Sequence, residues 1–320
     1  MSPAPGTDAA RLSGIGERGI MTARSMAKLI QEYRKTLKLI EVEELADLYI
    51  LRPPAFLLVK AMAGTNITPN QVTMLSMTVG VLGGICYGLG RPSTIVLGAI
   101  LLGLSLVFDC ADGQLARLKK NGTPLGRILD GLIDYVVQIA VFAGLAVGLD
   151  PGPGRRTVWI LLLAAAGLSN IFHSTVVDYY RLRFIDRAKG EKHDVPAEYR
   201  DFQAELDGLK GKPGSSVRRG VIRLYLRYLS LQMRMTRPGT ESRPASAAGR
   251  DEFYRANKAV MRGWTFLGSG TFGFLMVATT LIGRFDLYLW ARIVAGNLLA
   301  AVLFVVQIRI DRRLELRSAS

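Results

Sequence analysis

The sequence predicts an all-α polytopic membrane protein with six transmembrane helices and a juxtamembrane amphipathic helix. Three observations predict this class. Hydrophobic residues make up 49% of the 320-residue chain, its mean hydropathy is +0.24, and the apolar residues form continuous runs. Runs of about 20 apolar residues cross a bilayer as helices, whereas alternating runs are typical of membrane β-barrels. The continuous runs therefore favour helices.

The basic residues predict the orientation of these helices. We place the spans at residues 72–90, 93–116, 125–149, 157–180, 262–283 and 287–308. Of the 41 Lys and Arg residues, 36 lie in the two terminal segments or in residues 117–127 and 181–262. Positive residues stay on the cytoplasmic side, so we expect both termini in the cytoplasm. The net charge of +15 follows from this orientation, and nucleic acid is not an expected partner.

The polar segments divide the chain further. Residues 1–40 are expected to be a disordered basic extension. Residues 41–71 are predicted to lie on the cytoplasmic membrane surface as an amphipathic segment interrupted by Pro53 and Pro54, with a plain soluble helix as the alternative. Residues 72–183 hold the first four spans, 184–261 a basic cytoplasmic loop, 262–308 the last two spans and 309–320 a cytoplasmic tail. Within the loop, residues 216–235 resemble a basic amphipathic helix, and residues 237–250 a linker.

Four aspartates lie at the adjoining ends of the second and third spans. Asp109 and Asp112 are three residues apart, and Asp130 and Asp134 are four apart, so each pair shares a helix face. The short connection makes the two helices antiparallel neighbours, which can bring both acidic faces together. Clustered carboxylates repel one another unless cations neutralise them. Oxygen ligands favour Mg²⁺ or Mn²⁺, and two such ions can hold a diphosphate during displacement at phosphorus.

Small residues and basic residues accompany the aspartates. Gly113, Gly126 and Gly131 allow helices or a ligand to approach the backbone closely. Arg117 follows Asp112 by little more than one turn, where it can meet phosphate oxygens. The alternative is that the acids only form ion pairs with neighbouring basic residues, namely Arg117, Lys119, Lys120 and Arg127. Two Cys and two His residues make a zinc-type site unexpected.

The pattern Asp109-x2-Asp112-Gly113-x2-Ala116-Arg117-x8-Gly126-x3-Asp130-x3-Asp134 resembles the complete signature of the CDP-alcohol phosphatidyltransferase family. The resemblance covers roughly residues 40–310. It implies metal binding by Asp109, Asp112 and Asp130, with Asp134 beside the metal as general base. It also implies contacts with the CDP part of a substrate from Gly113, Ala116, Arg117 and Gly126, and from Asn70 and Thr73 before the first span. Helix capping is the alternative role of Asn70 and Thr73.

The resemblance also implies an activity. An acceptor hydroxyl attacks the phosphorus distal to cytidine, and CMP leaves. The expected donor is CDP-diacylglycerol, which makes a phospholipid; the alternative is a soluble CDP-alcohol, such as CDP-inositol or CDP-ethanolamine, with a lipid or sugar-alcohol acceptor. The enzyme is then a homodimer in the cell's inner or plasma membrane with its active site facing the cytoplasm. A transporter or a non-catalytic lipid-binding protein remains a further alternative, although acids clustered at one edge argue against an ion path.

Other charged residues have two interpretations each. Asp178, Arg181 and Arg183 at the end of the fourth span either form a pocket for an acceptor phosphate or are a basic flank of that span. Arg292, inside the sixth span, is expected to extend its guanidinium to the far membrane interface.

Overall fold

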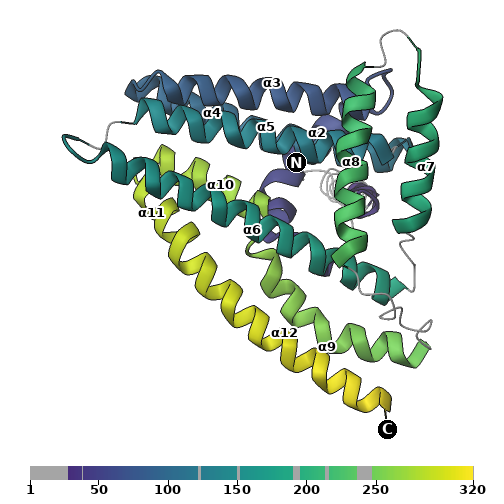
Figure 1. Ribbon diagram of the computed structural model, residues 1–320. Coiled ribbons are helices and arrows are strands. Elements are labelled where there is room, and N and C mark those ends of the chain that lie inside the picture. The colour runs from purple at the N-terminus through teal and green to yellow at the C-terminus, as the bar shows by residue number, and fades with distance from the viewer. Residues whose placement is uncertain are drawn as a thin grey trace, which may run out of the picture. The chain divides into compact units, whose positions relative to one another are not determined.

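The computed structural model describes residues 28–37, 39–121, 124–149, 152–189, 195–212, 216–235 and 247–319. The chain divides into two units, residues 1–38 and 39–320. In the first unit, residues 28–35 form a helix, and the expected disorder of the preceding residues lies outside the described part of the chain. The second unit holds all the other elements. Every regular element in the described residues is helical (Figure 1).

Four of the predicted spans are single long helices. They are α3 (Pro69–Gly88), α4 (Pro92–Lys119), α5 (Pro124–Gly148) and α6 (Arg156–Lys189). With Gly249–Leu281 and Phe285–Leu314, they give six helical segments long and apolar enough to cross a membrane. A helical polytopic membrane protein is thus confirmed, while the side on which the termini lie stays a prediction.

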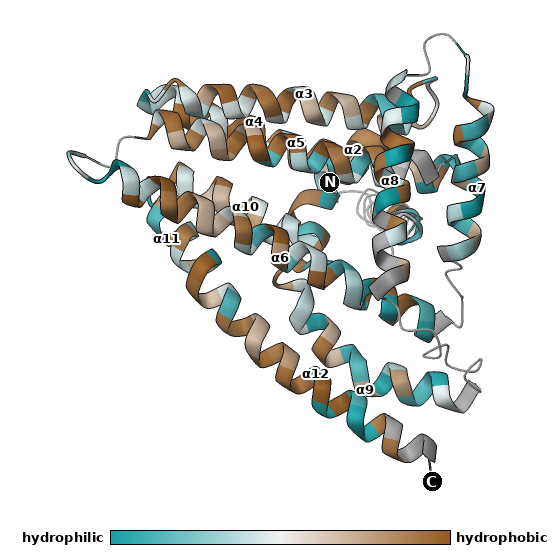
Figure 2. Cartoon of the chain, viewed as in Figure 1, coloured by the Kyte–Doolittle hydropathy of each residue, from teal (hydrophilic) through white to brown (hydrophobic). Residues whose placement is uncertain are grey.

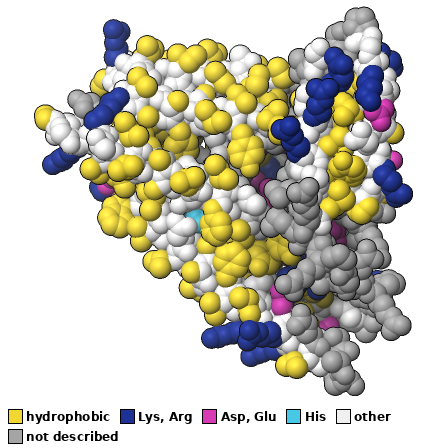
Figure 3. Space-filling model, viewed as in Figure 1, with side chains coloured by type: hydrophobic (Ala, Val, Ile, Leu, Met, Phe, Trp, Pro, Cys, Tyr) yellow, Lys and Arg dark blue, Asp and Glu magenta, His cyan; other side chains and the backbone are white. Residues whose placement is uncertain are grey.

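The surface of these helices suits a lipid environment. Large apolar side chains on their outward faces are exposed, for example Ile139, Leu168 and Leu298. Figure 2 shows apolar residues along the long helices, and Figure 3 shows apolar side chains over much of the visible face, with Lys and Arg at its edges. Contiguous apolar surface of this kind is rare on soluble monomers. The outward faces are therefore expected to contact lipid.

The fifth predicted span is interrupted. Instead of one helix over 262–283, the chain forms α9 (Ala247–Thr265), a turn, and α10 (Ser269–Leu281). The carboxylate of Glu44 accepts hydrogen bonds from the backbone N–H of Thr271, at 2.7 Å, and from its hydroxyl, at 3.0 Å. It therefore binds donors in the first turn of α10, and a Cβ at Gly268 would collide with it. A distant acidic side chain thus occupies the break between the two helices.

The sixth span contains a wide turn. It begins as α11 (Phe285–Trp290), continues as the π-helical segment η3 (Ala291–Ala295), and ends as α12 (Gly296–Ala319). Arg292 in η3 is fully buried. The expectation that it reaches the far interface is wrong, because polar and aromatic groups of neighbouring helices surround it inside the bundle.

The juxtamembrane segment begins with two short turns, η1 (Ile40–Val42) and η2 (Asp47–Leu51), and continues as α2 (Arg52–Met62). The prolines stand in the first turn of α2, directly after the π-helical segment η2, so the chain is helical on both sides of them. One face of α2 packs on α4, while Leu57 and Leu58 on another face are exposed. An ion pair between Arg52 and Glu43, at 2.6 Å, fixes the start of α2.

The segment predicted as a basic loop, residues 184–261, contains helices of its own. They are α7 (Val195–Gly208), α8 (Ser216–Met235) and most of α9. The sequence pattern identified α8, but not α7. The apolar face of α8, with Ile222 and Leu226, packs against Phe202 of α7. Most of the predicted linker, residues 237–250, lies outside the described residues.

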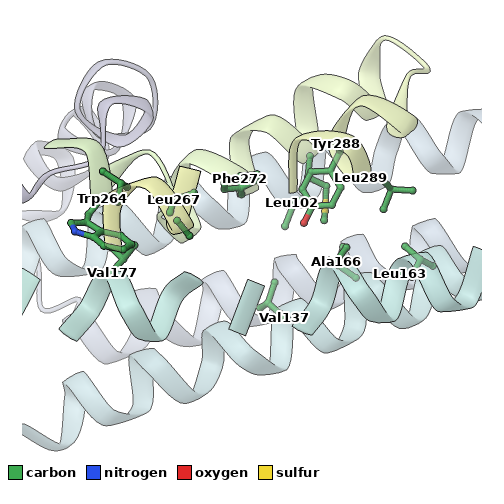
Figure 4. Close-up of a cluster of buried hydrophobic side chains, with 14 of the residues drawn as sticks. Leu102, Val137, Leu163, Ala166, Val177, Trp264, Leu267, Phe272, Tyr288 and Leu289 are labelled. Carbon is green, nitrogen blue, oxygen red and sulfur yellow. The ribbon is translucent and has the colours of Figure 1, made fainter. Parts of the chain in front are cut away.

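Two packing features hold the spans together. The main core cluster collects apolar side chains from α4, α5, α6, α9, α10 and α11, and Figure 4 shows Val177, Trp264 and Tyr288 among them. On the other side, α3 lies against both α4 and α5. At Gly84 the contact is so close that a Cβ would lie 2.6 Å from the backbone oxygen of Ala140. Small residues thus set the spacing of the helices that carry the aspartates.

Candidate active site

The aspartates of α4 and α5 meet at adjoining ends of the two helices. Asp109, Asp112 and Asp130 can each offer a carboxylate oxygen, and these oxygens lie within 4.8 Å of one another. The carboxyl of Asp134 lies next to that of Asp109. The helical spacing on α4 and α5 therefore turns both acidic pairs toward one point, as antiparallel neighbours require.

Lys119 does not pair with the acids of this cluster. Asp112 is 4% exposed, and its Oδ2 atom has no hydrogen-bond partner among the described residues. Lys119 instead donates to the backbone oxygens of Thr65 and Ile67, both at 2.8 Å. Arg117 lies near Asp112, but several carboxylates crowded into a buried place repel one another and are costly. Their oxygen-only donor set fits a hard divalent cation such as Mg²⁺ or Mn²⁺.

The small residues of the signature leave room beside this cluster. A Cβ at Gly113 would lie 3.5 Å from Nη1 of Arg117, so the guanidinium lies over the glycine. Gly131 is exposed, and a Cβ there would meet no atom within 4 Å. Ala116 and Gly126 are half-buried near the ends of their helices. A ligand can therefore approach the backbone of α5 at Gly131, whereas at Gly113 of α4 it meets the Arg117 guanidinium.

The start of α3 distinguishes between the two interpretations of Asn70 and Thr73, which are nucleotide contact and helix capping. Thr68 and Gln71 form the capping box: Gln71 N–H donates to Thr68 Oγ1 at 3.3 Å, and Thr68 N–H donates to Gln71 Oε1 at 2.9 Å. Asn70 therefore does not cap the helix and is exposed. Thr73 is buried beside the Asp112 carboxylate, and its hydroxyl donates to the backbone oxygen of Pro69 at 3.0 Å. Thr73 thus adjoins the acidic cluster.

A cavity of about 100 Å³, open to one side, lies between α3, α4, α5, α6 and α10. Asp109 and Asp134 line it, and most of its other lining residues are apolar. Its polar lining residues are Asp47, Ser76, Ser105, Gln138, Asn170 and Ser269. The hydroxyls of Ser76 and Ser105 bond to one another's backbone oxygens, at 2.8 and 2.9 Å. An apolar group can therefore lie next to the aspartates, and a longer one would extend through the open side.

Sequence reasoning missed Asp47 as a member of this site. It reaches the cavity from η2, and its Oδ1 atom is buried without a hydrogen-bond partner among the described residues. Burial, with a smaller contribution from Glu44, raises the pKa of Asp47 to about 7. The only signal in the sequence was an unusual run of acids, residues 41–47, in a segment expected to lie on the membrane surface.

The arginines at the end of α6 are paired with acids. Arg181 donates to Glu44 at 3.3 Å and to Asp178 at 3.2 Å, and Arg183 donates to Asp311 at 2.7 Å. The pair with Glu44 joins α6 to the juxtamembrane segment. These contacts support a structural role at the end of the span.

Known proteins resemble the part of the chain that holds this site. Residues 66–194 match the CDP-alcohol phosphatidyltransferase family. A bifunctional IPC transferase and DIPP synthase of Rubrobacter xylanophilus is 30% identical over 48% of this chain and 34% of its own length. Phosphatidylinositol phosphate synthases of Corynebacterium glutamicum and Mycobacterium marinum are each 30% identical, over 42% and 39% of this chain. The matches cover 57% and 51% of those two synthases, so the chain spans about half of their length.

The matched residues contain α3, α4, α5 and α6, and with them all four aspartates. The carboxylates that the signature pattern singles out are those that meet in space. Sequence comparison and geometry therefore agree on the same segment: residues 66–194, which match the CDP-alcohol phosphatidyltransferase family, hold the four aspartates that meet in space.

Proposed function

We propose that the protein is an integral membrane transferase that moves the phosphatidyl group of CDP-diacylglycerol onto a hydroxyl of inositol phosphate and releases CMP. The observation that carries this proposal is the meeting of Asp109, Asp112 and Asp130 within 4.8 Å beside a largely apolar cavity. Two relatives named phosphatidylinositol phosphate synthase support inositol phosphate as the acceptor.

The aspartates divide the chemistry between them. Asp109, Asp112 and Asp130 would hold divalent metal, which would supply positive charge for the diphosphate and for the leaving CMP. Asp134 accepts the proton of the acceptor hydroxyl. The acceptor oxygen then forms a bond to the phosphorus that carries diacylglycerol. The bond from that phosphorus to the oxygen of CMP breaks, CMP leaves with the electron pair, and Asp134 returns its proton to solvent.

The residues around the acids hold the nucleotide. Gly113 and Gly126 let the cytidine diphosphate lie against the helices, and Ala116 adds little bulk on the same helix. Arg117 donates to phosphate oxygens, for which a guanidinium is well suited. Thr73 and Asn70 contact the nucleotide from the start of α3, where Thr73 adjoins Asp112. The excess of basic residues on one side supports an active site that faces the cytoplasm.

A soluble CDP-alcohol such as CDP-inositol is the second candidate donor. The signature does not distinguish the two donor classes, and one relative is named bifunctional IPC transferase and DIPP synthase rather than phosphatidylinositol phosphate synthase. The apolar lining of the cavity favours the lipid donor.

The test is CMP release by the purified protein in liposomes that contain CDP-diacylglycerol, with inositol phosphate and Mg²⁺ or Mn²⁺. We expect release that EDTA abolishes and that either ion restores. Asp134→Asn should lower turnover by at least about 10²-fold, since a general base contributes on that order, while CDP binding is largely retained. Turnover at the wild-type rate in that variant would refute the role of Asp134, and release only from CDP-inositol would select the second donor.

A further inference from the structure

A chain of three polar side chains runs through the interior of the membrane-spanning bundle. Arg292 of η3 is 0% exposed and donates a hydrogen bond from Nη2 to Asn170 Oδ1 on α6. Asn170 Nδ2 donates in turn to Gln138 Oε1 on α5. The guanidinium carbon of Arg292 lies 4.0 Å from the centre of the Phe272 ring. A charged group at such a place is costly and marks a functional site by default.

Arg292 determines which group donates and which accepts in each of these hydrogen bonds. A guanidinium has only donors, so the oxygen of the Asn170 amide must face Arg292. The amide nitrogen of Asn170 then faces Gln138, which must accept with its oxygen. Amide orientations are usually ambiguous, but here each follows from the one before. Gln138 is left with its Nε2 donor, for which no described residue is an acceptor.

Gln138 lines the cavity one helical turn from Asp134. It follows Asp134 by four residues, so it lies on the same face of α5, about 6 Å further along the helix. Gln138 and Asn170 both line the cavity that Asp109 and Asp134 line. Apolar side chains surround them there, and Figure 4 shows Val137 of α5 and Tyr288 of α11 pointing into the space between their helices. A ligand at this point meets the Nε2 donor of Gln138 among largely apolar side chains.

We propose that Gln138 donates a hydrogen bond to an ester carbonyl of the diacylglycerol part of the donor, and that Asn170 and Arg292 are positioning residues that keep its N–H groups directed at that carbonyl. The inference rests on the proposed lipid donor. In such a donor the ester groups lie a few bonds from the reacting phosphorus, a separation comparable to the helical turn between Asp134 and Gln138. An ester carbonyl is only an acceptor, and the acyl chains beyond it suit the apolar walls.

The experiment compares two donors that differ only in this carbonyl. One is CDP-diacylglycerol and the other is the ether-linked CDP-dialkylglycerol with the same chain length, both in liposomes with inositol phosphate and Mg²⁺. We expect the wild-type kcat/KM to be about fivefold to tenfold higher for the ester, as expected for one net hydrogen bond. Gln138→Met keeps the length of the side chain but removes the donor. In this variant kcat/KM should fall for the ester, stay unchanged for the ether, and give a ratio near one.

Two further variants separate hydrogen bonding from packing. Val141→Ala changes the same cavity wall three residues further along α5 without touching a donor, so the ester-to-ether ratio should stay at its wild-type value. Asn170→Asp retains an acceptor for Arg292 but loses the donor to Gln138, whose amide can then turn. That variant should fold and should lower the ratio.

The outcomes distinguish this inference from the proposed function. A wild-type protein that uses both lipid donors equally well, or a Gln138→Met variant with an unchanged ratio, would overturn the inference and leave the transferase intact. Turnover of CDP-inositol without turnover of either lipid donor would overturn both.

Discussion

Asp112 and Arg292 are both charged side chains inside membrane-spanning helices, and their charges are balanced differently. Arg292 has the Asn170 amide and the Phe272 ring as partners. Asp112 Oδ2 has no partner among the described residues, and the carboxylates of Asp109 and Asp130 are its neighbours. An ion that binds this cluster stabilises only the folded protein. Without bound metal, the repulsion between these carboxylates therefore lowers the free energy of unfolding.

Replacing Asp112 by Asn tests the metal site. We expect the variant to unfold at a temperature a few degrees higher than the wild type in EDTA, because one repelling charge is gone. It should lose most of the stabilisation that Mg²⁺ gives the wild type, together with CMP release. Thermal unfolding in detergent, with and without Mg²⁺, measures both effects. Asp207→Asn is the matched control, since it removes an exposed carboxylate paired with Lys210 and should change neither. Equal Mg²⁺ stabilisation of Asp112→Asn and wild type would contradict the metal site.

At the scale of elements, the position of α5 depends on its contact with α3. Gly84 meets the backbone of Ala140, and backbone atoms cannot move aside as the end of a side chain can. Since α5 carries Asp130 and Asp134, a shift of α5 moves both acids away from those of α4. The packing at Gly84 therefore affects the position of the catalytic acids, because α5 moves as one rigid helix.

Replacing Gly84 by Ala should therefore reduce both stability and activity. We expect a lower unfolding temperature and a loss of CMP release of about tenfold or more, because small displacements of catalytic groups reduce rates strongly. Gly167→Ala on α6 is the control: a Cβ there meets no atom within 4 Å, and alanine favours the helix. Thermal unfolding and CMP release, measured on both variants, test this prediction. Wild-type behaviour of Gly84→Ala would show that the helices separate at little cost.

Two features of the helices could not be predicted from local sequence patterns. Apolar runs located the spans because each run is continuous along the chain. The break between α9 and α10 depends on Glu44, which is 227 residues away from Thr271, whose donors it binds. No feature of residues 262–283 alone contains that contact. The prolines of the juxtamembrane segment were expected to interrupt a helix, but the chain is helical on both sides of them, with a π-helical segment before and α2 after.

At the scale of the whole molecule, the acidic cluster was predictable and the rest of the cavity was not. The four aspartates lie on consecutive helices, so helical spacing and a short connection suffice to bring them together. Asn170 and Arg292 are 122 residues apart, and Asp47 enters from a segment before the first span. Their meeting depends on how α6, α10 and η3 pack, which no single segment of the sequence encodes.

The orientation of the whole chain in the membrane follows from its charge distribution and can be measured directly. The connection before α6 and the one between α7 and α8 are predicted on opposite sides of the membrane, because the first contains Arg155 as its one basic residue, whereas residues 181–262, which include the second, are rich in Lys and Arg. Pro153 and Lys212 are exposed in these two connections. In a background in which Cys86 and Cys110 are replaced, Pro153→Cys should react with a membrane-impermeant maleimide on intact cells. Lys212→Cys should react only after permeabilisation. The reverse pattern would put the aspartates, at the α4–α5 connection, on the outer face, where cytoplasmic CDP-linked donors do not reach them.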